Sequence, residues 1–164
     1  VVVEELAAIG VREIVAVDLA ASLYAEVPSG TIVLVSDAVC EDGTSKHYVP
    51  GVKEVAVADE LSSRLASKLA LRDIPFTTGR VWSTDAPYRE TAPEVLKYRS
   101  RDAVLVDMET AAFLAAGSAL GVETASLLVA ADTLFDDWQP PFDGRRVQTS
   151  LRIAARAARE CLLA

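Results

Sequence analysis

Short β-branched runs alternate with amphipathic helical segments along this chain, and this alternation is the feature that most constrains its fold. Residues 11–17 and 31–35 are apolar runs of strand length, and the second has the continuous apolar character of a strand buried on both faces of a sheet. Residues 57–72 place leucines four positions apart, opposite charged side chains, which predicts an amphipathic helix. The alternation continues with strands over 76–82, 104–106 and 125–131 and helices over 92–98, 108–120 and 147–163.

This order predicts an α/β fold with a mixed, largely parallel sheet and helices on both faces, because helical crossovers join parallel strands. The length of 164 residues is near the usual size of one domain, so residues 1–164 are expected to form a single domain. Hydrophobic residues make up 51% of the chain and charged residues 24%, which is too apolar for a disordered protein.

Charge and hydropathy exclude several kinds of partner. The 24 Asp and Glu residues against 16 Lys and Arg residues give a net charge of -8, which would repel a nucleic-acid backbone over most of the surface. No apolar run approaches the ~20 residues of a membrane span, and the start does not read as a signal peptide. We therefore expect a soluble, cytoplasmic protein that binds neither nucleic acid nor membrane.

The histidine and cysteine residues do not form the sequence patterns that are typical of metal or cofactor sites. The single histidine, His47, lies in a polar loop and is expected to form hydrogen bonds there, which excludes histidine-based metal sites and most catalytic triads. Cys40 and Cys161 lack the spacing of a metal site, so we expect buried free thiols. The prediction is a protein without a metal or cofactor.

The chain opens abruptly on a helical pattern. Residues 1–9 place Val2, Leu6 and Ile9 at helical spacing without a preceding methionine or capping residue. We expect this helix to continue a segment that is missing from the chain, and apolar patches left by that segment suggest a homo-oligomer or a partner.

Acids and hydroxyls follow the predicted strands. They are Asp18, Ser83, Thr84, Asp107 and Asp132. In open α/β sheets, ligands bind beyond the carboxyl ends of the strands, so these side chains are expected to line a crevice.

Several of these side chains also have a structural interpretation. Asp107 is placed to cap the helix that follows it, and Glu109 suits the positive end of that helix dipole. Asp132 follows the apolar run SLLVAA, so we expect a buried carboxyl whose neutral form is favoured and which is a candidate proton donor. Arg89 and Glu90 are interpreted as a surface pair.

Four aromatic residues stand near the predicted strand ends. They either stack on a flat ligand or pack in the core, and they are Trp82, Tyr88, Phe135 and Trp138.

Residues 106–112, with the sequence VDMETAA, resemble the nucleoside phosphorylase family that includes purine nucleoside phosphorylase, uridine phosphorylase and methylthioadenosine nucleosidase. Similar segments in the same order extend through almost the whole chain, over residues 4–10, 42–48, 83–88 and 131–132. The resemblance implies the fold of that family without its amino-terminal strands and glycine-rich phosphate loop.

The resemblance also implies roles for individual residues. Met108 would pack against ribose and Glu109 would accept hydrogen bonds from its hydroxyls. Asp132 would serve the purine N7 as the base leaves, assisted by Arg145 or Arg146 at the start of the last helix. The substrate site would further include Asp107, Ser83, Thr84 and Phe135, with Tyr88 beside the base.

One segment departs from the family. Active phosphorylases resemble an Arg-x-Gly-Thr-x-Gly turn that holds phosphate, whereas the corresponding positions here are Ala16, Asp18, Leu19 and Ala21. Two like charges ~4 Å apart cost about 4 kcal/mol at an effective dielectric of 20, roughly a thousandfold in binding, so Asp18 would oppose phosphate.

Three hypotheses follow. The first is an enzyme that cleaves the N-glycosidic bond of a purine-type nucleoside, with water favoured over phosphate as the nucleophile. The second is a non-catalytic relative that acts as a nucleoside-binding or oligomer-forming module. The third is phosphorolysis with cations from another chain, for which the candidates are Arg80, Arg89 and Arg101.

Overall fold

A six-stranded mixed sheet organises the computed structural model, which describes residues 2–134 and 144–163. The strands are β1 (Glu13–Ser22), β2 (Ile32–Cys40), β3 (Glu54–Ala56), β4 (Thr77–Ser83), β5 (Ala103–Asp107) and β6 (Glu123–Thr133). Their order is β3-β2-β4-β5-β1-β6. The two longest ladders, β1 with β6 and β2 with β4, are parallel, which confirms the predicted mixed, largely parallel sheet.

The sheet closes on itself. Strand β2 pairs with β4 along one edge and with Val129, Leu128 and Leu127 of β6 along the other, in the antiparallel sense. Strands β1 and β5 meet near their carboxyl ends, where Ala21 pairs with Val106. Five strands therefore form a ring, with β3 attached outside it to β2.

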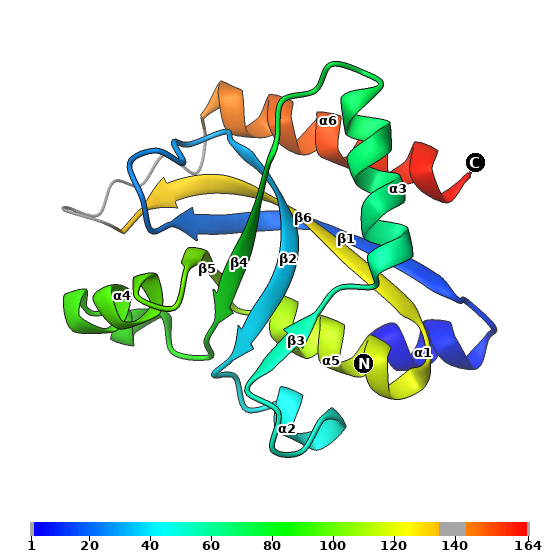
Figure 1. Cartoon of the computed structure of the whole chain (residues 1–164), viewed down its shortest axis with the longest axis horizontal. Helices are drawn as coiled ribbons and strands as arrows, with labels where there is room; N and C mark the ends of the chain where they lie inside the picture. The colour runs from blue at the N-terminus through cyan, green and yellow to red at the C-terminus, as the bar shows by residue number, and fades with distance from the viewer. Residues whose placement is uncertain (1, 135–143, 164) are drawn as a thin grey trace.

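Helices cover both sides of this sheet (Figure 1). They are α1 (Val2–Ala8), α2 (Ser45–Tyr48), α3 (Asp59–Ala70), α4 (Ala92–Arg99), α5 (Thr110–Leu120), α6 (Arg145–Leu162) and the 3-10 helix η1 (Pro87–Arg89). The leucine stripe of α3 packs with α6 against β6, whereas α5 packs on the other side through Leu114 and its neighbours. Each buried leucine contributes about 1.5–3 kcal/mol of hydrophobic stabilisation.

Helix α5 packs closely on β6 at Gly117, where the absence of a side chain leaves room for Thr124. Replacing Gly117 by Ala should lower the free energy of unfolding by about 1–2 kcal/mol, because overpacking outweighs the better helix propensity of alanine. A Cβ at this position would overlap Thr124 of β6 and lie 3.0 Å from Val122 O. Urea unfolding followed by circular dichroism measures the effect. The control Ser118→Ala, at the exposed next position, is expected to change stability by less than about 0.5 kcal/mol; equal midpoints for the two variants would contradict the prediction.

Two strands are longer than the sequence predicts. β1 continues to Ser22 and β6 to Thr133, so Asp18 and Asp132 lie within strands rather than after them. The small and apolar residues that follow Asp18 continue the parallel ladder with β6, across a register shift between Ala20 and Ala21. No glycine interrupts this segment, and the strand therefore replaces the turn that the family resemblance implies.

The structure also tests the predictions for the two cysteines and for His47. Cys40 and Cys161 are free, as predicted, although Cys40 is only partly buried. His47 lies in the short helix α2 rather than in a loop. Across residues 2–134 and 144–163, no helix combines the length and the apolar character that a transmembrane segment requires.

Candidate active site

A pocket of about 270 Å³ opens where the carboxyl ends of β1, β5 and β6 come together. Its walls contain apolar residues of these strands and several acidic residues. The acids lie at the strand ends, in the segment between β5 and α5, and directly after η1. The lining residues are Leu19, Ala20, Ala21, Pro87, Glu90, Val106, Asp107, Met108, Glu109, Ala131 and Asp132. The sequence predicted four of these as site residues, namely Asp107, Met108, Glu109 and Asp132.

Asp107 is the last residue of β5, and its carboxylate forms hydrogen bonds with two neighbouring elements, β4 and α5. Its Oδ1 accepts a hydrogen bond of 2.5 Å from Ser83 Oγ on β4, and its Oδ2 accepts bonds from the backbone N–H and the hydroxyl of Thr110. The Ser83 hydroxyl in turn accepts the N–H of Ala111 at 2.9 Å. Burial raises the pKa of the Asp107 carboxyl, and the bonds from Ser83 and Thr110 act in the opposite direction. Asp107 therefore ties two strands to the start of α5, as the capping interpretation predicted.

Met108 and Glu109 follow in the short segment between β5 and α5. Both side chains are exposed at the pocket, and Glu109 Oε2 accepts the N–H of Met108 at 3.2 Å. Desolvation raises the pKa of Glu109, and the charges of Asp107 and Asp18 add to this effect. The geometry presents a carboxylate and a thioether together, which suits a sugar with hydroxyls and an apolar face.

Asp132 lines the same pocket from β6. Its backbone pairs with Ala21 of β1, and the residue is only 5% exposed although it lines the pocket. The predicted burial of this acid is therefore confirmed. A buried carboxyl at a pocket wall is well placed to exchange a proton with a bound ligand.

The 3-10 helix η1 supplies a residue that the sequence analysis did not assign to the site. With three residues per turn, Pro87 and Glu90 fall on the same side, and both line the pocket. Tyr88, predicted to flank the base, is 99% exposed and is not among these lining residues. Arg89 lines a different pocket with Glu41 and Asp85, so Arg89 and Glu90 do not form the surface pair expected from their adjacency.

The remaining predicted residues are distributed around the site. Ser83 is fully buried and acts on the pocket through Asp107, whereas Thr84 lines the neighbouring pocket with Arg89. Arg145 is exposed at the first residue of α6, and Arg146 lines a separate pocket with Phe76. Phe135 and Trp138 lie outside the described residues.

The four positions that correspond to the phosphate turn form part of strand β1. Leu19 and Ala21 line the pocket together with Ala20, and the N–H of Leu19 donates to Asp18 Oδ1 at 2.7 Å. Within the described lining residues, every side chain that can carry a charge is a carboxylic acid. The site therefore favours neutral or cationic ligand groups at this wall and disfavours an anion.

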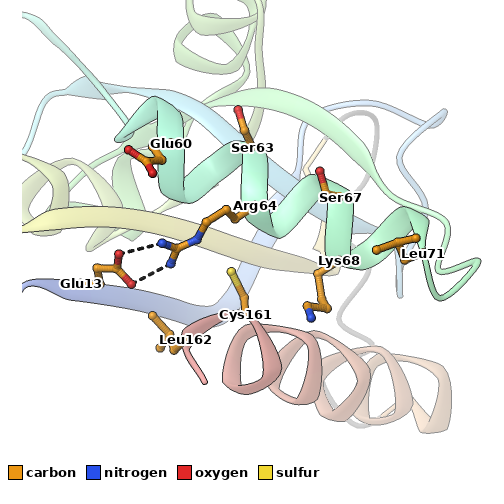
Figure 2. A pocket seen from close by; sticks show the side chains of 9 residues that line it. All are labelled: Glu13, Glu60, Ser63, Arg64, Ser67, Lys68, Leu71, Cys161 and Leu162. Carbon is orange, nitrogen blue, oxygen red and sulfur yellow. Dashed lines mark hydrogen bonds and ion pairs between the residues drawn. The ribbon is translucent and has the colours of Figure 1, made fainter. Parts of the chain in front are cut away.

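A larger cavity, of about 640 Å³, lies between α3, α6 and the start of β1 (Figure 2). Figure 2 shows the guanidinium of Arg64 turned toward Glu13, to which it donates two bonds of 2.8 and 2.7 Å. The buried Cys161 lines the cavity beside them. Because the charge of Arg64 is matched and none of the predicted site residues lies here, the strand-end pocket is the better candidate active site. Among the residues that the structure describes, no group of three or more His, Cys, Asp and Glu side chains is placed to bind a metal ion.

A family model described as the phosphorylase superfamily matches residues 1–164. The chain belongs to the phosphorylase superfamily. Membership in this superfamily confirms the resemblance drawn from residues 106–112.

Two curated proteins resemble this phosphorylase-superfamily chain at 26% identity. Uncharacterized protein R802 of Acanthamoeba polyphaga mimivirus aligns over 133 residues, which are 81% of this chain and 51% of the viral protein. Guanosine phosphorylase of Halorubrum lacusprofundi aligns over 167 residues, covering 96% of this chain and 69% of the archaeal protein. The chain thus spans about half the length of the first relative and about two thirds of the second.

Solved structures share the fold of this phosphorylase-superfamily chain. Purine nucleoside phosphorylase from Toxoplasma gondii, in complex with immucillin-H, superposes with a TM-score of 0.87 at 20% identity, over 98% of this chain and 66% of the other. Uridine phosphorylase from Vibrio fischeri superposes with a TM-score of 0.85 at 22% identity, over 99% of this chain and 68% of the other.

Proposed function

We propose that this chain hydrolyses the N-glycosidic bond of a purine-type nucleoside. One observation carries the proposal: an extended strand with Leu19, Ala20 and Ala21 forms the pocket wall where the resemblance implies a phosphate-binding turn. The charged groups in the described lining are carboxylates, which oppose phosphate and leave a neutral nucleoside unaffected. Water is therefore the favoured nucleophile.

In this proposal, some pocket residues bind the sugar and others act on the base. Glu109 accepts hydrogen bonds from the ribose hydroxyls, and Met108 packs against the sugar. Asp132 donates a proton to the base nitrogen as the glycosidic bond breaks, while a water molecule adds to C1′. Arg145, exposed at the start of α6, is proposed to assist the departing base. The name of the archaeal relative, guanosine phosphorylase, supports a purine base.

The proposal is tested by measuring free base with and without phosphate. Purified protein is incubated with adenosine, inosine or methylthioadenosine, and chromatography quantifies the base and the free sugar. We expect base release at the same rate in both buffers, with unphosphorylated sugar as the co-product. Release that requires phosphate and yields a sugar phosphate would contradict hydrolysis.

The non-catalytic alternative predicts a different result in the same experiment. A protein that only binds nucleosides would release no base but would give a binding isotherm in titration calorimetry with inosine. Heat of binding in the absence of turnover would therefore replace the hydrolase proposal with a nucleoside-binding function.

We also propose that the chain self-associates. Large apolar side chains are exposed at several positions, including Ile9, Leu71 and Leu163. Exposed apolar surface is typical of subunit interfaces in homo-oligomers. Light scattering coupled to size exclusion should give a mass that is a multiple of 17.5 kDa; a monomer mass at all concentrations would contradict this expectation.

A further inference from the structure

Glu90 lies in the candidate active site without a role in the proposed reaction. It follows η1 directly, its side chain is half-buried, and it lines the same pocket as Asp132. The 3-10 turn determines this position, because it places Pro87 and Glu90 on one side and exposes Tyr88 on another. The backbone of this turn, closed by a hydrogen bond from the N–H of Glu90 to Pro87 O, therefore brings residue 90 to the pocket.

The surroundings of Glu90 contain acids and apolar walls. The other titratable side chains in the described lining are Asp107, Glu109 and Asp132, and the neighbouring Arg89 lines a different pocket. Asp107 accepts hydrogen bonds from Ser83 and Thr110, and Glu109 is exposed between β5 and α5. Glu90 is half-buried and Asp132 is 5% exposed, and the two carboxyls line this one small pocket.

Burial and the negative charge of Asp132 raise the pKa of Glu90 to about 7. Two carboxylates that share a site with apolar walls do not both ionise readily, since each charge disfavours the other. The protons of such groups belong to the pair and leave it in two separate steps. A pair of this kind keeps its last proton up to a higher pH than an isolated carboxyl does.

We propose that Glu90 and Asp132 form a proton-sharing carboxyl pair, in which Glu90 keeps one proton available for Asp132 to donate. The inference rests on the proposed hydrolysis. Asp132 transfers the proton to the base as the bond from C1′ to the base nitrogen breaks, and the bonding electrons go to the base. Water adds to C1′, and the proton that it loses returns to the pair. Glu90 acts through Asp132 and is therefore a positioning residue.

The pH dependence of kcat/KM for base release tests the pair. The wild-type value should fall as pH rises above about 7, because the pair then loses its proton. In Glu90→Gln this fall should move to lower pH by about one unit or more, and kcat/KM at pH 7 should decrease about 10-fold or more. The control Glu94→Gln changes a partly exposed acid on α4 that pairs with Lys97 and should keep the wild-type profile. A wild-type profile in Glu90→Gln would overturn the inference while leaving hydrolysis intact.

A second measurement does not depend on turnover. In protein with 13C-labelled glutamate carboxyls, one NMR signal should titrate near pH 7, disappear in Glu90→Gln and titrate at lower pH in Asp132→Asn. This pattern in a protein without base release would support the pair and remove the proposed hydrolysis. A Glu90 signal that titrates between pH 4 and 5, as an unperturbed glutamate does, would overturn the pair whatever the activity.

Discussion

Replacing Asp132 by Asn should reduce base release by roughly 10²- to 10⁴-fold, the range expected for loss of a positioned proton donor. Asn has nearly the same shape but carries no transferable acidic proton. Asp132 is 5% exposed at the pocket wall, so solvent has little access to replace it. Nucleoside affinity, measured by calorimetry, should change far less than kcat, because the sugar contacts of Met108 and Glu109 remain.

The control for this experiment is Asp73→Asn. Asp73 is exposed and has a φ of 50°, a backbone conformation that asparagine adopts readily. Its replacement should leave both turnover and stability near the wild-type values. Full turnover in Asp132→Asn would exclude Asp132 as the proton donor.

The second large effect is expected at Asp107, on stability rather than on chemistry. Asp107→Ala should lower the free energy of unfolding by about 2–5 kcal/mol, because it leaves the buried groups of Ser83 and Thr110 without their acceptor. The same change releases the link between β4, β5 and α5, so base release should also fall.

Urea unfolding monitored by circular dichroism measures this effect. Asp107→Asn retains an acceptor for Thr110 and should be less destabilising than Asp107→Ala. Asp59→Ala, an exposed acid in the first turn of α3, should cost less than about 1 kcal/mol. A loss in Asp107→Ala no larger than that of Asp59→Ala would show that the network of Ser83 and Thr110 contributes little.

The sequence predicted the helices and strands in which a pattern of apolar residues extends over several helical turns or several strand residues. The leucine stripe of α3 lies where expected because burial on one face of a helix requires that periodicity. The apolar runs of β2 and β6 also lie where expected, because strands buried on both faces are continuously apolar. Strand ends were less well predicted. β1 and β6 continue past Asp18 and Asp132 because the backbone pairing between these two strands extends beyond both acids. Local composition does not report pairing between strands that are distant in sequence.

The candidate site was predicted only in part, for a related reason. Asp107 and Asp132 were predicted because each comes after an apolar run, and Met108 and Glu109 because residues 106–112 resemble the family. All four line one pocket. Glu90 was missed because its placement depends on a single 3-10 turn, which is too short for a periodic signal. Pro87 starts the 3-10 turn, and Glu90 follows it by three residues. This spacing is the local sequence feature that indicates that Pro87 and Glu90 face the same side.

Strand β1, which stands where the resemblance implies a phosphate-binding turn, offers few backbone N–H groups to an anion. The N–H of Leu19 is already bound to the Asp18 carboxylate, and the main chain from Glu13 to Ser22 is committed to its ladder with β6. An arginine introduced at position 16 would add a cation but no free backbone donors. Binding of an anionic nucleophile at this wall therefore requires a new path for the main chain, which a change of one side chain does not supply.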